Sequence, residues 1–104
     1  MTNPLPNRLK TARKIAGLTQ QELGMRLGME ESTASARMNQ YEKGKHAPAY
    51  QTMQRIAKEL DLPVAYFYCD DEMLSRLLCL IAKLSPQIQQ ELFDSLSAQA
   101  LDSH

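Results

Sequence analysis

Side chains that can both donate and accept hydrogen bonds gather in one short stretch of this sequence, residues 34–43. Ser35, Asn39 and Gln40 stand there beside Arg37. A primary amide presents a donor and an acceptor in one plane, which matches the N6 and N7 atoms of adenine. Such side chains offer little to an apolar core. We therefore expect this stretch to be hydrated or to lie against base edges.

The charges of the 104-residue chain sum to zero but are unevenly divided. Residues 1–60 hold ten Lys and Arg against five acidic residues, a net charge of +5, whereas residues 61–104 hold two against seven, a net charge of −5. A basic half of this kind suits a polyanionic partner, although a solvated basic face without a partner fits the same numbers.

The other reactive residue types do not form a recognisable site. Cys69 and Cys79 lack a second cysteine pair, which disfavours structural zinc, and we expect two free thiols. His46 has no Cys, Asp or second His at ligand spacing and is interpreted as a loop residue or phosphate donor. Paired carboxylates in one site, a nucleophile with a base and a phosphate-binding glycine loop are also missing, so we expect no enzyme, no metal and no cofactor.

Composition favours one small domain without a membrane segment. The mean hydropathy is −0.42, and no run of 18 apolar residues would span a bilayer. The first residues lack a basic region followed by an apolar stretch, which disfavours a secretory signal. The sequence therefore predicts a cytoplasmic protein.

Apolar residues recur at helical spacing through almost the whole chain, and no run of alternating β-branched residues predicts a strand. We therefore expect an all-α fold. Its helices are predicted over residues 7–16, 19–27, 34–43, 50 or 52 to 60, 63 to about 68, 71–84 and 86–101. Asn7 is the predicted N-cap of the first helix, and Thr19 with Glu22 forms the predicted capping box of the second.

Three segments of this chain resemble a known family. They read RLKTARKIAGLTQQELGMRLGM, YEKGKHAP and IAKELDLPVAYF. In this order they resemble the DNA-binding domain of the Xre/Cro/C1-type repressors over about residues 7–68. The resemblance implies a five-helix lambda-repressor-like DNA-binding domain in residues 1–69, followed by two C-terminal helices in residues 70–104.

The chain departs from the family pattern before the third helix. Between Gly28 and Met38 the family usually has fewer residues, so we infer an insertion of about four residues around Met29 to Ser32. We expect it to lengthen the turn and to change the tilt of the third helix.

The resemblance implies that the third helix reads bases in the major groove. Counting back from the Glu-Lys-Gly segment, the family's base-reading positions fall on Ser35, Ala36 and Gln40. Either Ala36 offers a methyl contact to thymine, or the inserted segment brings Arg37 and Asn39 into the groove. We expect the five residues to share the reading role.

Phosphate contacts are expected on both sides of this helix. Thr19 and Gln20 begin the second helix, where free amides and the helix dipole favour an anion. The segment after the third helix, where members of the family contact the opposite DNA backbone, contains Lys43, Lys45 and His46.

Two arginines have expected partners of another kind. The resemblance implies a structural ion pair between Arg13 and Glu42, which joins the first helix to the end of the third. Arg37 has a second interpretation, as a phosphate clamp or as the ion-pair partner of Glu30 or Glu31.

The last two helices carry a broad apolar stripe beyond a complete domain. We expect this stripe to form a homodimer interface, and the alternative is that both helices fold back on their own domain. The predicted interface residues are Leu74, Leu77, Leu78, Ile81, Ile88, Leu92 and Leu96.

Taken together, these features predict a sequence-specific DNA-binding transcriptional regulator. We expect a dimeric repressor or autoregulator that binds a palindromic operator in double-stranded DNA, with two recognition helices about one helical turn apart. The alternative is a protein-interaction module, such as an antitoxin or anti-repressor, whose C-terminal helices bind another protein.

Overall fold

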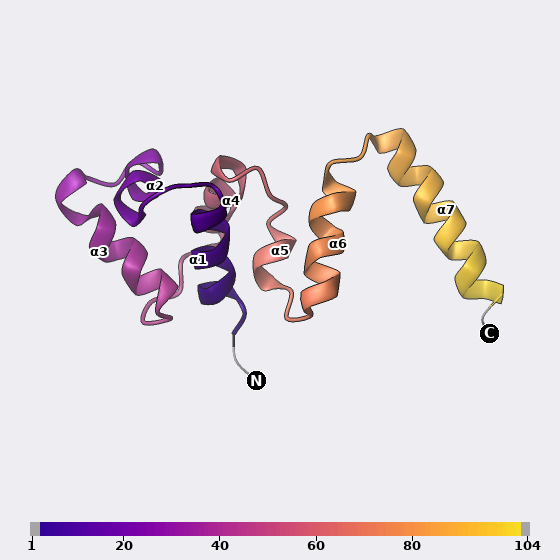
Figure 1. Cartoon of the computed structure of the whole chain (residues 1–104), viewed down its shortest axis with the longest axis horizontal. Helices are drawn as coiled ribbons and strands as arrows, with labels where there is room; N and C mark the ends of the chain where they lie inside the picture. The colour runs from indigo at the N-terminus through magenta and orange to yellow at the C-terminus, as the bar shows by residue number, and fades with distance from the viewer. Residues whose placement is uncertain (1–2, 103–104) are drawn as a thin grey trace.

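The structure, a computed structural model, describes residues 3–102 (Figure 1). Seven α-helices and no strand occur in this range, which confirms the expected all-α fold. The helices are α1 (Leu5–Ile15), α2 (Gln20–Arg26), α3 (Glu31–Glu42), α4 (Tyr50–Glu59), α5 (Ala65–Tyr68), α6 (Glu72–Ala82) and α7 (Pro86–Asp102).

The first five helices surround one apolar core. Burial of each large aliphatic or aromatic side chain contributes about 1.5–3 kcal/mol, so this core is the main source of stability. The buried residues of the core are Leu5, Leu9, Ala12, Leu18, Leu23, Leu27, Met38, Met53, Ile56, Ala57, Tyr66 and Phe67.

Helix α1 begins two residues before the predicted start. The N-cap is Pro4, and the Asn3 Oδ1 atom accepts a hydrogen bond of 3.0 Å from the Leu5 amide. Asn7 lies inside the helix, so its prediction as N-cap is wrong. The physical reason is Pro6, which occupies the first turn, where a missing amide proton costs no intrahelical hydrogen bond.

Helix α3 also begins early, and this corrects the expected effect of the insertion. The extra residues do not lengthen the turn before the third helix. They form an additional helical turn instead, because α3 starts at Glu31, and the Glu30 carbonyl accepts a hydrogen bond of 2.9 Å from the Ala34 amide. An acidic residue in the first turn is stabilised by the helix dipole.

Helix α5 is shorter than predicted. Pro63 and Val64 form a turn before it, in which their carbonyls accept hydrogen bonds of 3.1 Å from the amides of Tyr66 and Phe67. The helix proper therefore begins at Ala65.

Helix α6 packs on the core through its small residues. Ser75 is fully buried, and Cys79 packs against the core. Arg8 of α1 holds the start of this helix: its Nε atom donates to the Cys69 carbonyl at 2.7 Å, and its Nη1 atom lies 3.1 Å from Glu72 Oε2.

Both cysteines are free thiols, and burial raises the pKa of the Cys79 thiol.

Helix α7 stands away from the rest of the molecule (Figure 1). The radius of gyration is 16.3 Å, compared with about 13 Å for a compact domain of this size, and the molecule measures 56 × 31 × 22 Å. The Gln89 Nε2 atom donates to the Ile81 carbonyl at 2.8 Å, which links α7 to α6. The alternative interpretation, in which both C-terminal helices fold back on the first domain, is therefore wrong for α7.

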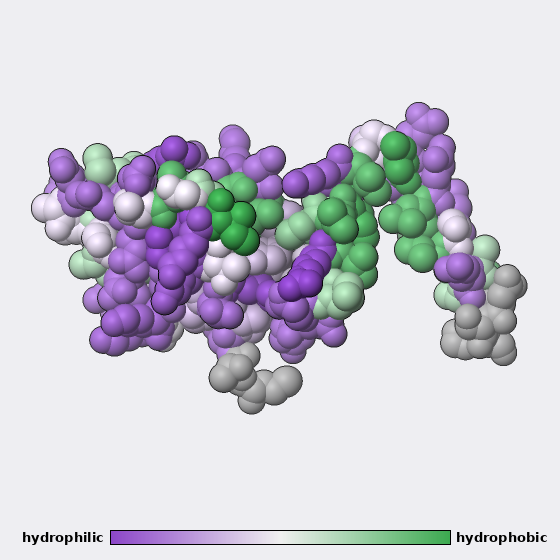
Figure 2. All heavy atoms as spheres, viewed as in Figure 1, coloured by the Kyte–Doolittle hydropathy of each residue, from purple (hydrophilic) through white to green (hydrophobic). Residues whose placement is uncertain are grey.

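The sides of α6 and α7 that face each other are apolar (Figure 2). Three of the predicted interface residues, Leu78, Ile81 and Leu92, are half-buried. We call the exposed members of this surface the C-terminal apolar face. They are Met73, Leu74, Leu77, Leu80, Ile88, Phe93 and Leu96, each with between 43% and 64% of its surface exposed. Among the described residues, no helix has the length and apolarity needed to cross a membrane.

Candidate nucleic-acid interface

Helix α2 has the capping box that its sequence predicts. The Glu22 amide donates to Thr19 Oγ1 at 3.0 Å, and the Thr19 amide donates to Glu22 Oε1 at 3.1 Å. The hydrogen bond from the Thr19 backbone lowers the pKa of Glu22, since it favours the ionised carboxylate. The box fixes where α2 begins and thereby how it meets α3.

Helices α2 and α3 approach each other closely at Gly24. A Cβ atom at this position would lie 2.8 Å from the Ala34 Cβ atom and 3.1 Å from its backbone. Only glycine fits without a shift of one helix. This contact brings the two helices together as a rigid pair, joined by the short turn that Gly28 begins at a φ of +92°.

One face of α3 is buried and the opposite face is open. Ala34, Met38 and Glu42 are buried, whereas Ala36 and Gln40 are exposed. At about 100° per residue, the centre of the open face contains Ser32, Ala36, Gln40 and Lys43. Sequence reasoning did not select Ser32, because it was assigned to the turn rather than to the helix.

The other predicted reading residues lie on the two flanks of that open face. Ser35 and Arg37 are exposed but point about 160° apart around the helix axis, and Asn39 is half-buried. The structure therefore does not bring the five predicted residues into a single narrow stripe. Ala36 and Gln40 share the centre, Ser35 and Asn39 share one flank, and Arg37 occupies the other.

Gln20 of α2 holds the Ser35 and Asn39 flank. Its Nε2 atom donates to Asn39 Oδ1 at 3.2 Å and to Glu42 Oε1 at 3.1 Å, and Ser35 Oγ donates to Gln20 Oε1 at 3.5 Å. The side-chain oxygen Oδ1 of Asn39 thereby accepts one hydrogen bond within the protein, and its Nδ2 group remains available as a donor. A sequence gives no direct signal for this link, because it depends on the packing distance between two helices.

Arg13 and Glu42 form a bidentate ion pair behind the open face. Arg13 Nε and Nη2 lie 2.6 and 3.0 Å from the two carboxylate oxygens of Glu42, and Arg13 Nη1 donates to the Leu18 carbonyl at 2.7 Å. The side chains are 10% and 2% exposed, so the pair is largely desolvated. It connects α1, the α1–α2 turn and the end of α3.

The residues expected to contact phosphates surround the C-terminal half of α3. Lys43, Lys45 and His46 are all exposed after its last turn. The contacts of Gln20 place the start of α2, with Thr19, beside the same half of the helix.

Arg37 does not make the ion pair that one interpretation assigned to it. Three ion pairs occur within residues 3–102, and none of them joins Arg37 to Glu30 or Glu31.

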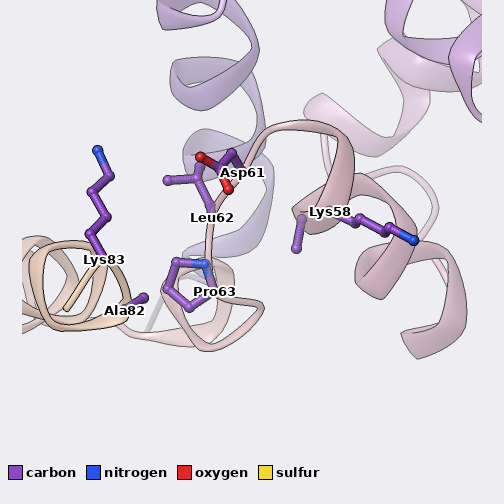
Figure 3. Close-up of a pocket in the computed structure, with 7 residues that line it drawn as sticks. Lys58, Asp61, Leu62, Pro63, Ala82 and Lys83 are labelled. Atoms are coloured by element: carbon purple, nitrogen blue, oxygen red, sulfur yellow. The ribbon is translucent and has the colours of Figure 1, made fainter. Parts of the chain in front are cut away.

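A hollow also lies between α4 and α6 (Figure 3). Lys58 and Lys83 line it, but their side chains point away from each other, so no group of functional side chains converges there. In the part of the chain that the structure describes, no three His, Cys, Asp or Glu residues are placed to hold a metal ion.

Comparison with known proteins relates the chain to a protein family and to solved structures. The model of a family described as helix-turn-helix matches residues 9–67. The solved structure of the transcriptional regulator BswR is 42% identical to this chain, superposes with a TM-score of 0.83, and aligns over 90% of this chain and 93% of its own. None of the curated proteins matches the chain.

Proposed function

This chain belongs to the Xre/Cro/C1-type helix-turn-helix family, and from that premise we propose that it is a dimeric repressor or autoregulator that binds a palindromic operator. Membership of the family makes it a DNA-binding transcriptional regulator. The identity of 42% with a transcriptional regulator over nine-tenths of the chain supports the same role.

The observation that carries the proposal is the open face of α3. Ala36 and Gln40 are exposed at its centre, while the buried Arg13–Glu42 pair and the close α2 contact hold the helix from behind. The face belongs to the half of the chain with a net charge of +5. A rigid helix with an open polar face in a basic domain is suited to the major groove, which is about 12 Å wide.

Four of the five predicted reading residues have a base-contacting role in this arrangement. Gln40 would pair with adenine through its donor and acceptor, and the Ala36 methyl would contact the methyl group of thymine. Asn39 would donate from Nδ2, because its Oδ1 atom is turned toward Gln20, from which it accepts a hydrogen bond. Ser35 lies on the same flank and would donate or accept through its hydroxyl.

Backbone contacts would orient this helix. Thr19 and Gln20 would contribute backbone amides at the start of α2, and Lys43, Lys45 and His46 would contact the opposite strand. These contacts carry no sequence information but make binding depend on salt.

Residues 1–69 would be the DNA-binding domain, and residues 70–104 would form a homodimer through the C-terminal apolar face. Seven large apolar side chains that are 43–64% exposed make a surface of the kind that marks an interface. A second copy would cover it and tether two recognition helices, which strengthens binding to a two-part site. Occupation of an operator that overlaps a promoter would then repress transcription.

Selection of bound duplexes from a random pool tests the proposal. We expect an enriched motif with two inverted half-sites whose centres lie about one helical turn apart. Gln40→Ala should bind the selected site about 5- to 150-fold more weakly and relax the preference at one position of each half-site, whereas Gln54→Ala, an exposed glutamine of α4, should bind like the wild type. Failure to enrich any motif would reject sequence-specific binding, and a motif with a single half-site would reject the dimer.

A further inference from the structure

A second polar hollow lies beside the recognition helix. It has a volume of about 250 Å³ and is enclosed by the α2–α3 turn, α3 and α4. Its lining residues include two arginines, two residues that carry a hydroxyl group and no acidic residue. The lining residues are Leu27, Gly28, Met29, Arg37, Tyr41, Thr52 and Arg55.

Arg55 of α4 is held in position at the edge of this hollow. Its Nη2 atom donates a hydrogen bond to the Leu27 carbonyl at the end of α2. Gly28, next in the chain, lies beside the guanidinium, since a Cβ atom there would be in ordinary van der Waals contact with Arg55 Nη2 at 3.7 Å. One of the five donors of Arg55 is thus used for anchoring, and the group is oriented without being neutralised.

Arg37 contributes the second positive charge. It extends from the α4-facing flank of α3, and among the described residues it has neither a carboxylate nor a hydrogen-bond acceptor as a partner. Two guanidinium groups that line one hollow repel each other unless an anion lies between them. The arrangement therefore has unused capacity for a negatively charged ligand.

We propose that this hollow binds a phosphate group through Arg37 and Arg55, with the Tyr41 and Thr52 hydroxyls as further donors. Guanidinium forks match phosphate oxygens in a bidentate manner, and a phosphate has enough acceptor oxygens for several donors. Arg37 is then a backbone contact rather than a base reader.

The source of the phosphate follows from the place of the hollow and rests on the proposed function. It lies on the opposite flank of α3 from Ser35 and Asn39, so a helix in the major groove would bring it toward a sugar-phosphate backbone. The DNA contacts of this chain would thereby extend onto α4, which sequence reasoning did not select.

The salt dependence of DNA binding tests the role of the pair. Each lost phosphate contact makes the slope of log affinity against log salt less steep by about 0.9. The ratio of wild-type affinity to that of Arg37→Gln should therefore fall three- to fourfold between ~50 and ~200 mM salt. The motif selected from a random pool should stay the same. Arg55→Lys keeps the charge and tests the fork geometry, and Lys58→Gln, which removes a cation of the same helix outside this hollow, should keep the wild-type slope. An unchanged slope in Arg37→Gln, or an altered motif, would overturn the proposal.

Nitrogen-15 NMR of the arginine Nε signals separates the two sources of phosphate. In the wild-type protein, we expect the signals of Arg37 and Arg55 to move on addition of a duplex of about two helical turns, and inorganic phosphate at high concentration to move the same two signals. Movement with inorganic phosphate alone would assign the hollow to a free phosphate compound and would count against the DNA contact. If neither probe moves the two signals, the site does not exist, whereas a selected motif would still support the proposed function.

Discussion

At the scale of single residues, the ion pair Arg13–Glu42 determines how the open face of α3 is supported. The resemblance to the repressor family indicated both positions, and the structure shows the pair with two short contacts. The role of Gln20 could not be predicted in the same way. Its amide joins Ser35, Asn39 and Glu42 only because α2 and α3 pack closely, and that distance is not encoded in any one residue.

Loss of Glu42 should destabilise the protein more than loss of Gln40. Glu42→Ala leaves a buried guanidinium without its carboxylate, which costs about 3–5 kcal/mol in a fully desolvated pair, whereas Gln40 is exposed. At about 4–8 °C per kcal/mol, the thermal midpoint of Glu42→Ala should fall by at least about 10 °C. Differential scanning calorimetry of both variants measures this, and equal midpoints would show that the pair does not stabilise the fold.

At the scale of the elements, the start of α3 shows where sequence reasoning reached its limit. The departure from the family pattern around Met29 to Ser32 predicts a longer turn before the third helix. In the structure, Glu31 instead begins the helix, and one extra turn is added to its N-terminus. Periodicity located the helices well, since each of the seven covers more than half of its predicted range, but it does not locate their first residue.

Gly24→Ala should weaken both folding and DNA binding. The added methyl group would lie 2.8 Å from the Ala34 Cβ atom, so α2 and α3 must move apart. Overpacking of this kind costs typically about 1–3 kcal/mol, and the moved helix would no longer fit the groove. Thermal unfolding together with fluorescence anisotropy on the selected duplex measures both effects. An alanine variant with wild-type stability and affinity would show that the close approach is not required.

The link between α1 and α6 should weaken in acid. The hydrogen bond from Arg8 lowers the pKa of Glu72, with further contributions from the charges of Arg8 and Arg76. A carboxyl group whose pKa is lower in the folded state stabilises the fold fully above its unfolded pKa of about 4.3, and this contribution is lost as the pH falls through the folded value.

The midpoint of thermal unfolding, measured from about pH 6 to about pH 3, tests this link. The wild type should be more stable than Glu72→Gln at the upper end, and the two curves should converge toward the lower end. Glu59→Gln serves as the control, since Glu59 makes no ion pair among the described residues. Parallel curves for the wild type and Glu72→Gln would contradict the assigned contribution.

At the scale of the whole molecule, the separation of α7 from the core is the feature that the sequence could indicate only in part. The apolar stripe was evident from its spacing, but the side of α6 that packs on the core was not. The small residues Ser75 and Cys79 determine which side of α6 packs on the core, because they allow a close approach. Leu74 and Leu77 remain exposed on the outer side. The resulting apolar surface extends over α6 and α7 (Figure 2).

A charge within the C-terminal apolar face should separate the proposed dimer. Leu77→Lys places an ammonium group at the centre of the surface, where burial without a partner is costly. The sedimentation coefficient should fall to that of a monomer, and affinity for a two-part operator should fall about 10²- to 10⁴-fold through loss of tethering. Ile15→Lys changes an apolar residue of α1 that is 81% exposed and should leave both measurements unchanged. A monomeric wild-type protein would instead assign this face to a different partner.

Photo-crosslinking shows whether the open face of α3 lies against nucleobases. Operator thymines are replaced by 5-iodouracil, whose iodine occupies the major-groove position of the thymine methyl group. Irradiation of the complex and mass spectrometry of the peptides then identify the residues in contact. We predict crosslinks within residues 31–43. Crosslinks confined to α1, α4 or the C-terminal helices would show that a surface other than α3 lies in the major groove.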